Sequence, residues 1–121
     1  MKTLDTYREI LMTPAENEAM LRLQGDISKV DGVTRVVLFG SRARGDFNGN
    51  SDYDILVVMD QMDIQVKNEI IHVLHEIEMD YDIPLSPVIR TEAEYQKNRK
   101  MGSRFITNIE NDGIIIYDSH N

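Results

Sequence analysis

The sequence predicts a small α/β (α+β) fold, in which a mixed sheet of about four strands carries flanking helices. Two apolar runs of strand length, VTRVVLF (33–39) and ILVVM (55–59), stand among segments with helical periodicity. The 121 residues fit one domain, which we expect to span 1–121. No long crossover helix separates the first two strands, so we do not expect them to be a simple parallel pair.

The first predicted helix covers about residues 14–30. Thr13 suits the N-cap position, and Pro14 suits the first helical position because its missing N–H has no intrahelical partner there. Glu16 lies near the positive end of the helix, where a carboxylate is favourable. An Asp-Gly pair at 31–32 is expected to end the helix and turn the chain into the first strand.

The central part of the chain is expected to be strand, turn, loop and strand. The strand over 33–39 runs into a single helical turn over 41–44, and the composition of 45–51 (GDFNGNS) is that of a loop. The second strand, over 53–59, is nearly all apolar, which predicts that both of its faces are covered.

The C-terminal half is expected to add one long helix, one strand, two short helices and a last strand. The prolines of the third strand favour an edge or bulged position, because each removes a donor from the sheet. The expected elements are a helix over 62–79 with Asp63 as its cap, a strand over 81–89, helices over 91–101 and 103–111, and a strand over 114–117.

Composition excludes several classes of protein. With no cysteine there is no disulfide framework and no thiolate metal site. No apolar stretch approaches the roughly 20 residues that span a bilayer, and no signal peptide opens the sequence, so we expect a cytoplasmic protein without membrane contact. The net charge of −8 argues against direct binding of nucleic acid, which needs clustered Lys and Arg.

The most informative segment is GSRARGDFNGNSDYD, which joins the two apolar strands. Asp52 and Asp54 are two apart on a strand, so they point to the same side with Cα atoms about 6.6 Å apart. Mg²⁺ favours a couple of carboxylates together with waters and substrate phosphates. Either Asp-x-Asp or Gly-Ser alone is common in ordinary turns and strand ends. Their combination between two strands predicts a phosphate site beside a metal site.

Four residues before the aspartates are candidates for nucleotide binding. Gly40 has no Cβ and lets the backbone approach a ligand closely. Ser41 offers a hydroxyl and opens a helical turn whose free N–H groups favour anions. Arg42 and Arg44 could add charge-assisted hydrogen bonds to phosphate oxygens, although an ordinary surface role is an equal alternative for each arginine taken alone.

These residues resemble the signature of the DNA polymerase beta-like nucleotidyltransferase superfamily, and within it the minimal nucleotidyltransferases. The pattern of that family is Gly-Ser, ten residues and Asp-x-Asp, which is complete here as Gly40-Ser41 and Asp52-Tyr53-Asp54. The resemblance implies the polymerase beta-like fold and transfer of AMP from ATP with two Mg²⁺ ions. It implies that Gly40 and Ser41 hold the triphosphate and that Asp52 and Asp54 bind metal.

The superfamily usually has a third carboxylate on a later strand, which binds metal and activates the acceptor hydroxyl. Asp82, in Tyr81-Asp82-Ile83, is our candidate for this catalytic and metal-binding acid. An alternative register places Pro84 or Ser86 at that position, and the alternation of the strand does not decide between them.

Many minimal nucleotidyltransferases resemble the antitoxin of a toxin–antitoxin pair. The resemblance implies a HEPN-domain ribonuclease toxin as partner, AMPylation of one of its tyrosines and a hetero-oligomer. The acidic charge would suit docking onto a basic partner. Two alternatives remain: an antitoxin that neutralises its partner by masking alone, and a nucleotidyltransferase that modifies a small molecule.

Overall fold

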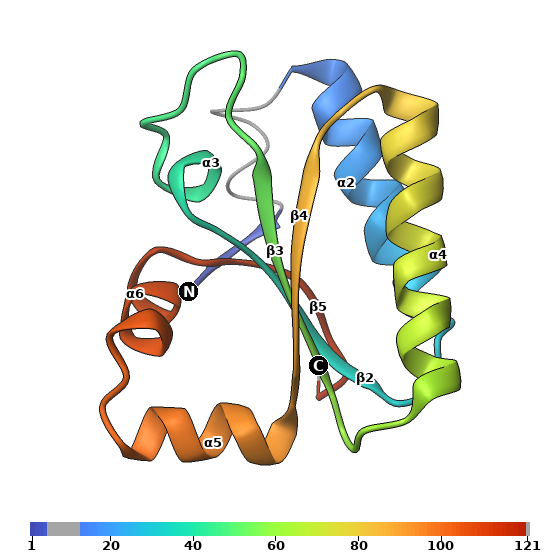
Figure 1. The fold of residues 1–121 in the computed structure, drawn as a ribbon. Coiled ribbons are helices and arrows are strands. Elements are labelled where there is room, and N and C mark those ends of the chain that lie inside the picture. The colour runs from blue at the N-terminus through green and yellow to red at the C-terminus, as the bar shows by residue number, and fades with distance from the viewer. Residues whose placement is uncertain (5–12, 121) are drawn as a thin grey trace.

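The structure is a computed structural model that describes residues 1–4 and 13–120. In these residues five strands form one mixed sheet in the order β1-β5-β2-β3-β4 (Figure 1). The strands are β1 (Lys2–Thr3), β2 (Val33–Phe39), β3 (Tyr53–Met59), β4 (Leu85–Thr91) and β5 (Ile114–Asp118). Two-residue β1 was not predicted, and the other four strands were.

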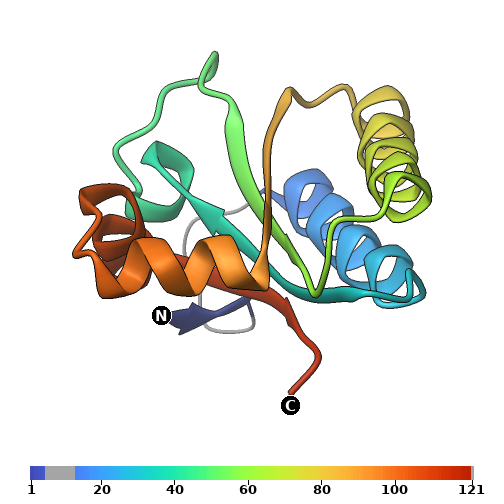
Figure 2. The same ribbon diagram turned by 60° about the horizontal axis from the view of Figure 1, so that its bottom comes forward.

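Helices cover both faces of the sheet. They are α2 (Pro14–Ile27), α3 (Ser41–Arg44), α4 (Ile64–Tyr81), α5 (Glu92–Lys100) and α6 (Arg104–Asp112). Figures 1 and 2 show α2 and α4 on one side of the sheet, and α5 and α6 on the other. The predicted fold class is therefore confirmed. Among the helices of the described residues, none has the length and apolar character to cross a membrane.

The pairing of the strands agrees with two expectations from the sequence. β2 and β3 are antiparallel, in agreement with the expectation that they are not a simple parallel pair. β4 pairs with β3 in parallel and forms one edge of the sheet, a position that tolerates the missing N–H of Pro87.

β3 is an interior strand of the sheet, between β2 and β4, and has a core on each side. Tyr53, Ile55 and Val57 belong to the cluster packed under α2 and α4. Leu56 and Val58 belong to the cluster packed under α5 and α6. Because side chains alternate along a strand, Asp54 also lies on the α5–α6 side. The alternation of side chains along β3 thus places the Asp54 carboxylate on the face of the sheet that α5 and α6 cover.

The predicted helix caps are confirmed. The Thr13 side chain accepts a hydrogen bond from the Glu16 N–H, and the Glu16 carboxylate accepts one from the Thr13 N–H. Asp63 caps α4 by accepting from two backbone N–H groups. Thr91 caps α5 with a second capping box. These caps satisfy N–H groups that have no partner inside the helix.

The predicted strand over 81–89 is wrong in its first part. α4 continues to Tyr81, Asp82 is its C-cap with φ 52°, and β4 begins only at Leu85. Contacts with α2 hold this last turn of α4: Arg22 forms an ion pair with Asp80, and its guanidinium lies 5.8 Å from the centre of the Tyr81 ring. Local sequence does not reveal such contacts between helices.

Candidate functional site

The Gly40 turn lies directly against the carboxylate of Asp54. β2 ends at Phe39, which pairs with Asp54 on β3. Gly40 then adopts φ 75° and ψ −156°, a conformation that is essentially restricted to glycine. A Cβ at Gly40 would overlap the Asp54 carboxylate. The glycine therefore allows the chain to turn into α3 while leaving room for the acid.

Asp52 and Asp54 influence each other electrostatically. The pKa of Asp54 is raised above its ordinary value, mainly by burial and then by the negative charge of Asp52, while the positive charge of Arg44 acts in the opposite direction. Asp52 itself is exposed. The ionised form of Asp54 is therefore unfavourable in the folded chain, and a bound cation would make it favourable.

We expect Asp54→Asn to raise the stability of the metal-free protein at neutral pH. Folding raises the pKa of Asp54. At pH values between the pKa of the unfolded chain and that of the folded chain, the unfolded chain has lost the Asp54 proton and the folded chain still holds it. The free energy of unfolding therefore falls as the pH rises through this range. Asparagine removes the penalty, so the melting temperature should rise by a few degrees.

Thermal unfolding measured between pH 7 and about pH 4 checks this expectation, since the gain should shrink as Asp54 becomes protonated in both states. Glu18→Gln, which removes an exposed charge from α2, is the matched control and should change little. A loss of stability in Asp54→Asn at pH 7 would show that the ionised carboxylate has a structural role instead.

Arg44 supplies a cation next to the aspartates. It is close enough for its charge to lower the pKa of Asp54. Its side chain is 44% exposed and donates to the carboxylate of Asp46 over 3.2 Å. An exposed pair of this kind is weak and easily exchanged for another anion. A phosphate could therefore replace Asp46 as the ion-pair partner of Arg44.

Arg42 lies elsewhere. Its guanidinium is 4.3 Å from the centre of the Phe47 ring and 4.4 Å from that of Tyr53. It also forms an ion pair with Glu16 at 3.1 Å and donates to the Ser51 carbonyl oxygen at 3.2 Å. Tyr53 faces α2, so the Arg42 guanidinium lies on the side of the sheet opposite to Asp54.

The structure therefore gives Arg42 a positioning role that sequence reasoning missed. It connects α2 with the loop that leads into Asp52, and only 7% of it is exposed. Glu16 was expected only to be favourable at the positive end of α2. Its carboxylate completes the capping box of that helix and also binds Arg42. A direct contact of the Arg42 side chain with nucleotide was our expectation, and this arrangement does not favour it.

The third acid is not found on the strand where it was expected. Asp82 ends α4 and borders a separate cavity between that helix and Pro84. Ser86 is the β4 residue that pairs with Asp54, so their side chains share one face. In the described part of the chain, no three acidic or histidine side chains gather into a metal-binding group.

The residues present nevertheless fit a divalent ion that also binds substrate. Asp52 and Asp54 offer two carboxylates, and burial together with mutual repulsion disfavours the charge on Asp54 when no cation is bound. Mg²⁺ is commonly held by one or two carboxylates, with water and phosphate oxygens completing its coordination. Metal binding by Asp52 and Asp54 remains a prediction, as does metal binding by Asp82.

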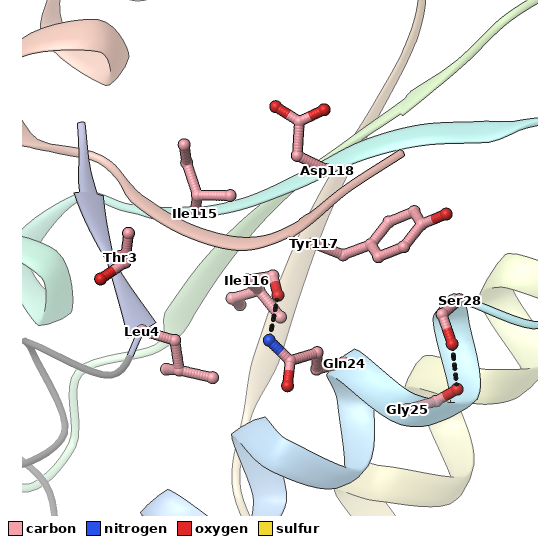
Figure 3. Close-up of a pocket in the computed structure, with 9 residues that line it drawn as sticks. All are labelled: Thr3, Leu4, Gln24, Gly25, Ser28, Ile115, Ile116, Tyr117 and Asp118. Atoms are coloured by element: carbon pink, nitrogen blue, oxygen red, sulfur yellow. Dashed lines mark hydrogen bonds between the residues drawn. The ribbon is translucent and has the colours of Figure 1, made fainter. Parts of the chain in front are cut away.

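A cavity of about 440 Å³ lies away from these residues, between α2 and β5 (Figure 3). Gln24 donates to the Ile116 carbonyl oxygen at its floor. Asp118 is the charged residue among those that line it, and this carboxylate is 3.9 Å from Arg35. A cavity with this lining offers no cation for a phosphate, so its size alone does not make it a nucleotide site.

The fold and the Gly40–Asp54 segment define a class of protein. The family model of the nucleotidyltransferase domain matches residues 21–116, and the chain belongs to this family. Two proteins of Methanocaldococcus jannaschii are similar, and both are described as "putative protein adenylyltransferase". MJ0141 is 37% identical over 100 residues, covering 80% of this chain and 94% of the relative. MJ0604 is 29% identical over 85 residues, covering 70% and 79%.

A solved structure is also similar. It is the crystal structure of a protein from Sulfolobus solfataricus described as a "putative nucleotidyltransferase", with a TM-score of 0.49 and 21% identity. The match covers 93% of this chain and 95% of that one.

Proposed function

We propose that the protein is an adenylyltransferase that moves AMP from ATP to a hydroxyl group on another protein. Membership of the nucleotidyltransferase family supports the reaction class. The descriptions of the two archaeal relatives support a protein acceptor. The observation that carries the proposal is the contact between the Gly40 turn and Asp54, with Asp52 and Arg44 close by.

In the proposed reaction the acceptor oxygen attacks the α-phosphorus of ATP in line with the leaving group. A new P–O bond forms to the acceptor, the bond between the α-phosphorus and the bridging oxygen breaks, and pyrophosphate leaves. Ser41 and Arg44 hold the departing phosphates by hydrogen bonds and charge. Ser86 faces Asp54 where a carboxylate would act as base, so we assign the hydroxyl proton to solvent.

Asp52 and Asp54 would hold two Mg²⁺ ions, which neutralise charge that develops on the phosphate oxygens. The protein itself contributes position: β3 fixes Asp54, and the loop tied down by Arg42 fixes Asp52. Fixed geometry of this kind lowers the entropic cost of bringing the reacting groups together.

We further propose that the acceptor is a tyrosine of a HEPN-domain ribonuclease toxin, that the protein acts in the cytoplasm as its antitoxin, and that the two form a hetero-oligomer. This rests on the resemblance to minimal nucleotidyltransferases. The net charge of −8 suits docking onto a basic RNA-binding protein.

The test is to express the protein together with a HEPN-domain ribonuclease toxin and to follow label from ATP. Label at the α-phosphate should appear on a tyrosine of the partner, and label at the γ-phosphate should not. The variant Asp52→Asn/Asp54→Asn should fold and transfer nothing, because the paired carboxylates are lost. Transfer by this variant at the original rate would contradict the proposal.

A non-catalytic antitoxin is the second candidate, and the absence of a carboxylate at Ser86 is the observation that favours it. Such a protein would neutralise the toxin by covering its active site. Growth of cells that express the toxin separates the two functions. Asp52→Asn/Asp54→Asn should fail to rescue growth if neutralisation needs transfer, and should rescue it fully if masking is sufficient.

A further inference from the structure

A smaller cavity, of about 200 Å³, adjoins the Gly40 turn. The cavity lies between residues of α6 and the Gly40 turn with Arg44, and Figure 2 shows these segments near each other. Its lining residues are Phe39, Gly40, Arg44, Phe105, Asn108, Ile109 and Asp112. Because Gly40 also contacts Asp54, the cavity begins next to the proposed reaction centre.

Aromatic rings form one wall of this cavity. Phe39 and Phe105 meet edge to face, with ring centres 5.4 Å apart and an angle of 88° between the rings. Phe105 remains 37% exposed, which is high for a phenylalanine that also packs on another ring. Accessible aromatic surface of this kind is what the flat face of a nucleobase stacks on.

Two polar side chains line the same cavity from α6. Asn108 and Asp112 are four residues apart, so they lie on the same face of the helix. Neither side chain has a hydrogen-bond partner among residues 1–4 and 13–120. An ionised carboxylate only accepts hydrogen bonds, whereas an amide both donates and accepts. Together they match a base edge with an amino group beside a ring nitrogen, as in adenine.

The alternative occupant is the phosphate tail, and the lining argues against it. Arg44, which follows the Gly40 turn, is the one cation among the lining residues, and α6 contributes none. The Asp112 carboxylate would repel a phosphate and would accept from an amino group. The side of the cavity that α6 provides therefore suits an uncharged ring with a donor at its edge.

We propose that this cavity binds the nucleobase of the triphosphate substrate, and that Asn108 and Asp112 select adenine. The proposal rests on the proposed function, because it assumes that a nucleotide lies against the Gly40 turn. It adds the location of the base and the residues that read it. Phe105 would supply the stacking surface, and Asp112 would accept from the exocyclic amino group.

Calorimetric binding of non-hydrolysable nucleotides in the presence of Mg²⁺ tests the proposal without requiring transfer. The probes are the α,β-methylene analogues of ATP and ITP and inorganic tripolyphosphate. The two analogues differ in the base, because inosine carries a carbonyl oxygen where adenine carries its amino group, and tripolyphosphate has no base. The adenine analogue should bind more tightly than the inosine analogue. Phe105→Ala should weaken the adenine analogue about 10-fold and leave tripolyphosphate unchanged.

Asp112→Asn should remove most of the preference for adenine over inosine, because an amide can donate to the inosine oxygen. The matched control is Asn111→Ala, an exposed position on α6 outside the cavity, which should bind all three probes as the unaltered chain does. Circular dichroism and melting curves establish that each variant is folded.

The assignment would be overturned by equal binding of the two analogues, by unchanged binding in folded Phe105→Ala and Asp112→Asn, or by no binding of the adenine analogue to the unaltered chain. Equal weakening of tripolyphosphate would make the cavity a phosphate site and would also overturn it. Selective binding without AMP transfer to any acceptor would refute the proposed function and leave the base site standing.

Discussion

Gly40→Ala is expected to lower the rate of AMP transfer by about 100-fold or more, because a misplacement of about 1 Å in a reacting group can cost that much. The new Cβ would overlap the Asp54 carboxylate and force it from its position. The backbone would also be strained by about 1–3 kcal/mol, since φ 75° with ψ −156° suits only glycine. Transfer rates and urea unfolding of the purified variant measure both effects.

A double-mutant cycle separates the two causes. In an Asp54→Ala background the carboxylate is gone, so Gly40→Ala should cost less stability there than in the original chain. Gly102→Ala is the matched control, because Gly102 has φ +69° with open space where a Cβ would lie, and it should show backbone strain alone. An unchanged transfer rate in Gly40→Ala would refute the close contact between the turn and Asp54.

Arg42→Ala is expected to destabilise the fold by about 3 kcal/mol, because removing one partner of a largely buried ion pair leaves the other without compensation. The side chains of Arg42 and Glu16 are 8% and 16% exposed. The loss also removes the contacts with two aromatic rings and with the Ser51 carbonyl oxygen, next to Asp52. The free energy of unfolding in urea, with its slope, measures the effect.

Arg44→Ala serves as the control for this variant, since it removes the same type of side chain from an exposed position in the same helical turn and should cost less than about 0.5 kcal/mol. Combining Arg42→Ala with Glu16→Gln should cost clearly less than the sum of the two single changes. Equal stability of Arg42→Ala and Arg44→Ala would mean that the buried pair contributes nothing measurable.

Much of the fold could be predicted because its signals are local. The strands over 33–39 and 53–59 were predicted to the residue. Gly32 and Gly40 flank the first strand, and the second consists almost entirely of apolar residues. Thr13, Asp63 and Thr91 marked helix starts through their own side chains. The end of α4 was missed because its last turn contacts another helix, where Arg22 pairs with Asp80, and local sequence does not show such contacts.

Some features of the candidate site could also be predicted from local sequence, and others could not. Gly40 and Asp54 could be placed together from the sequence because a single antiparallel pair brings them side by side. The direction of the Arg42 side chain could not, since it depends on Glu16 from α2 and on the alternation of β3. The cavity beside Phe105 could not be predicted either, because it exists only where α6 packs near the Gly40 turn.

The most direct measurement is a crystal structure of the protein with Mn²⁺ and the α,β-methylene analogue of ATP, with the metal located by its anomalous signal. We expect anomalous peaks within bonding distance of the carboxylates of Asp52 and Asp54 and of the nucleotide phosphates, and no peak there in Asp52→Asn/Asp54→Asn. Bound nucleotide with the two carboxylates turned away from it, and no metal between them, would contradict the proposed reaction centre.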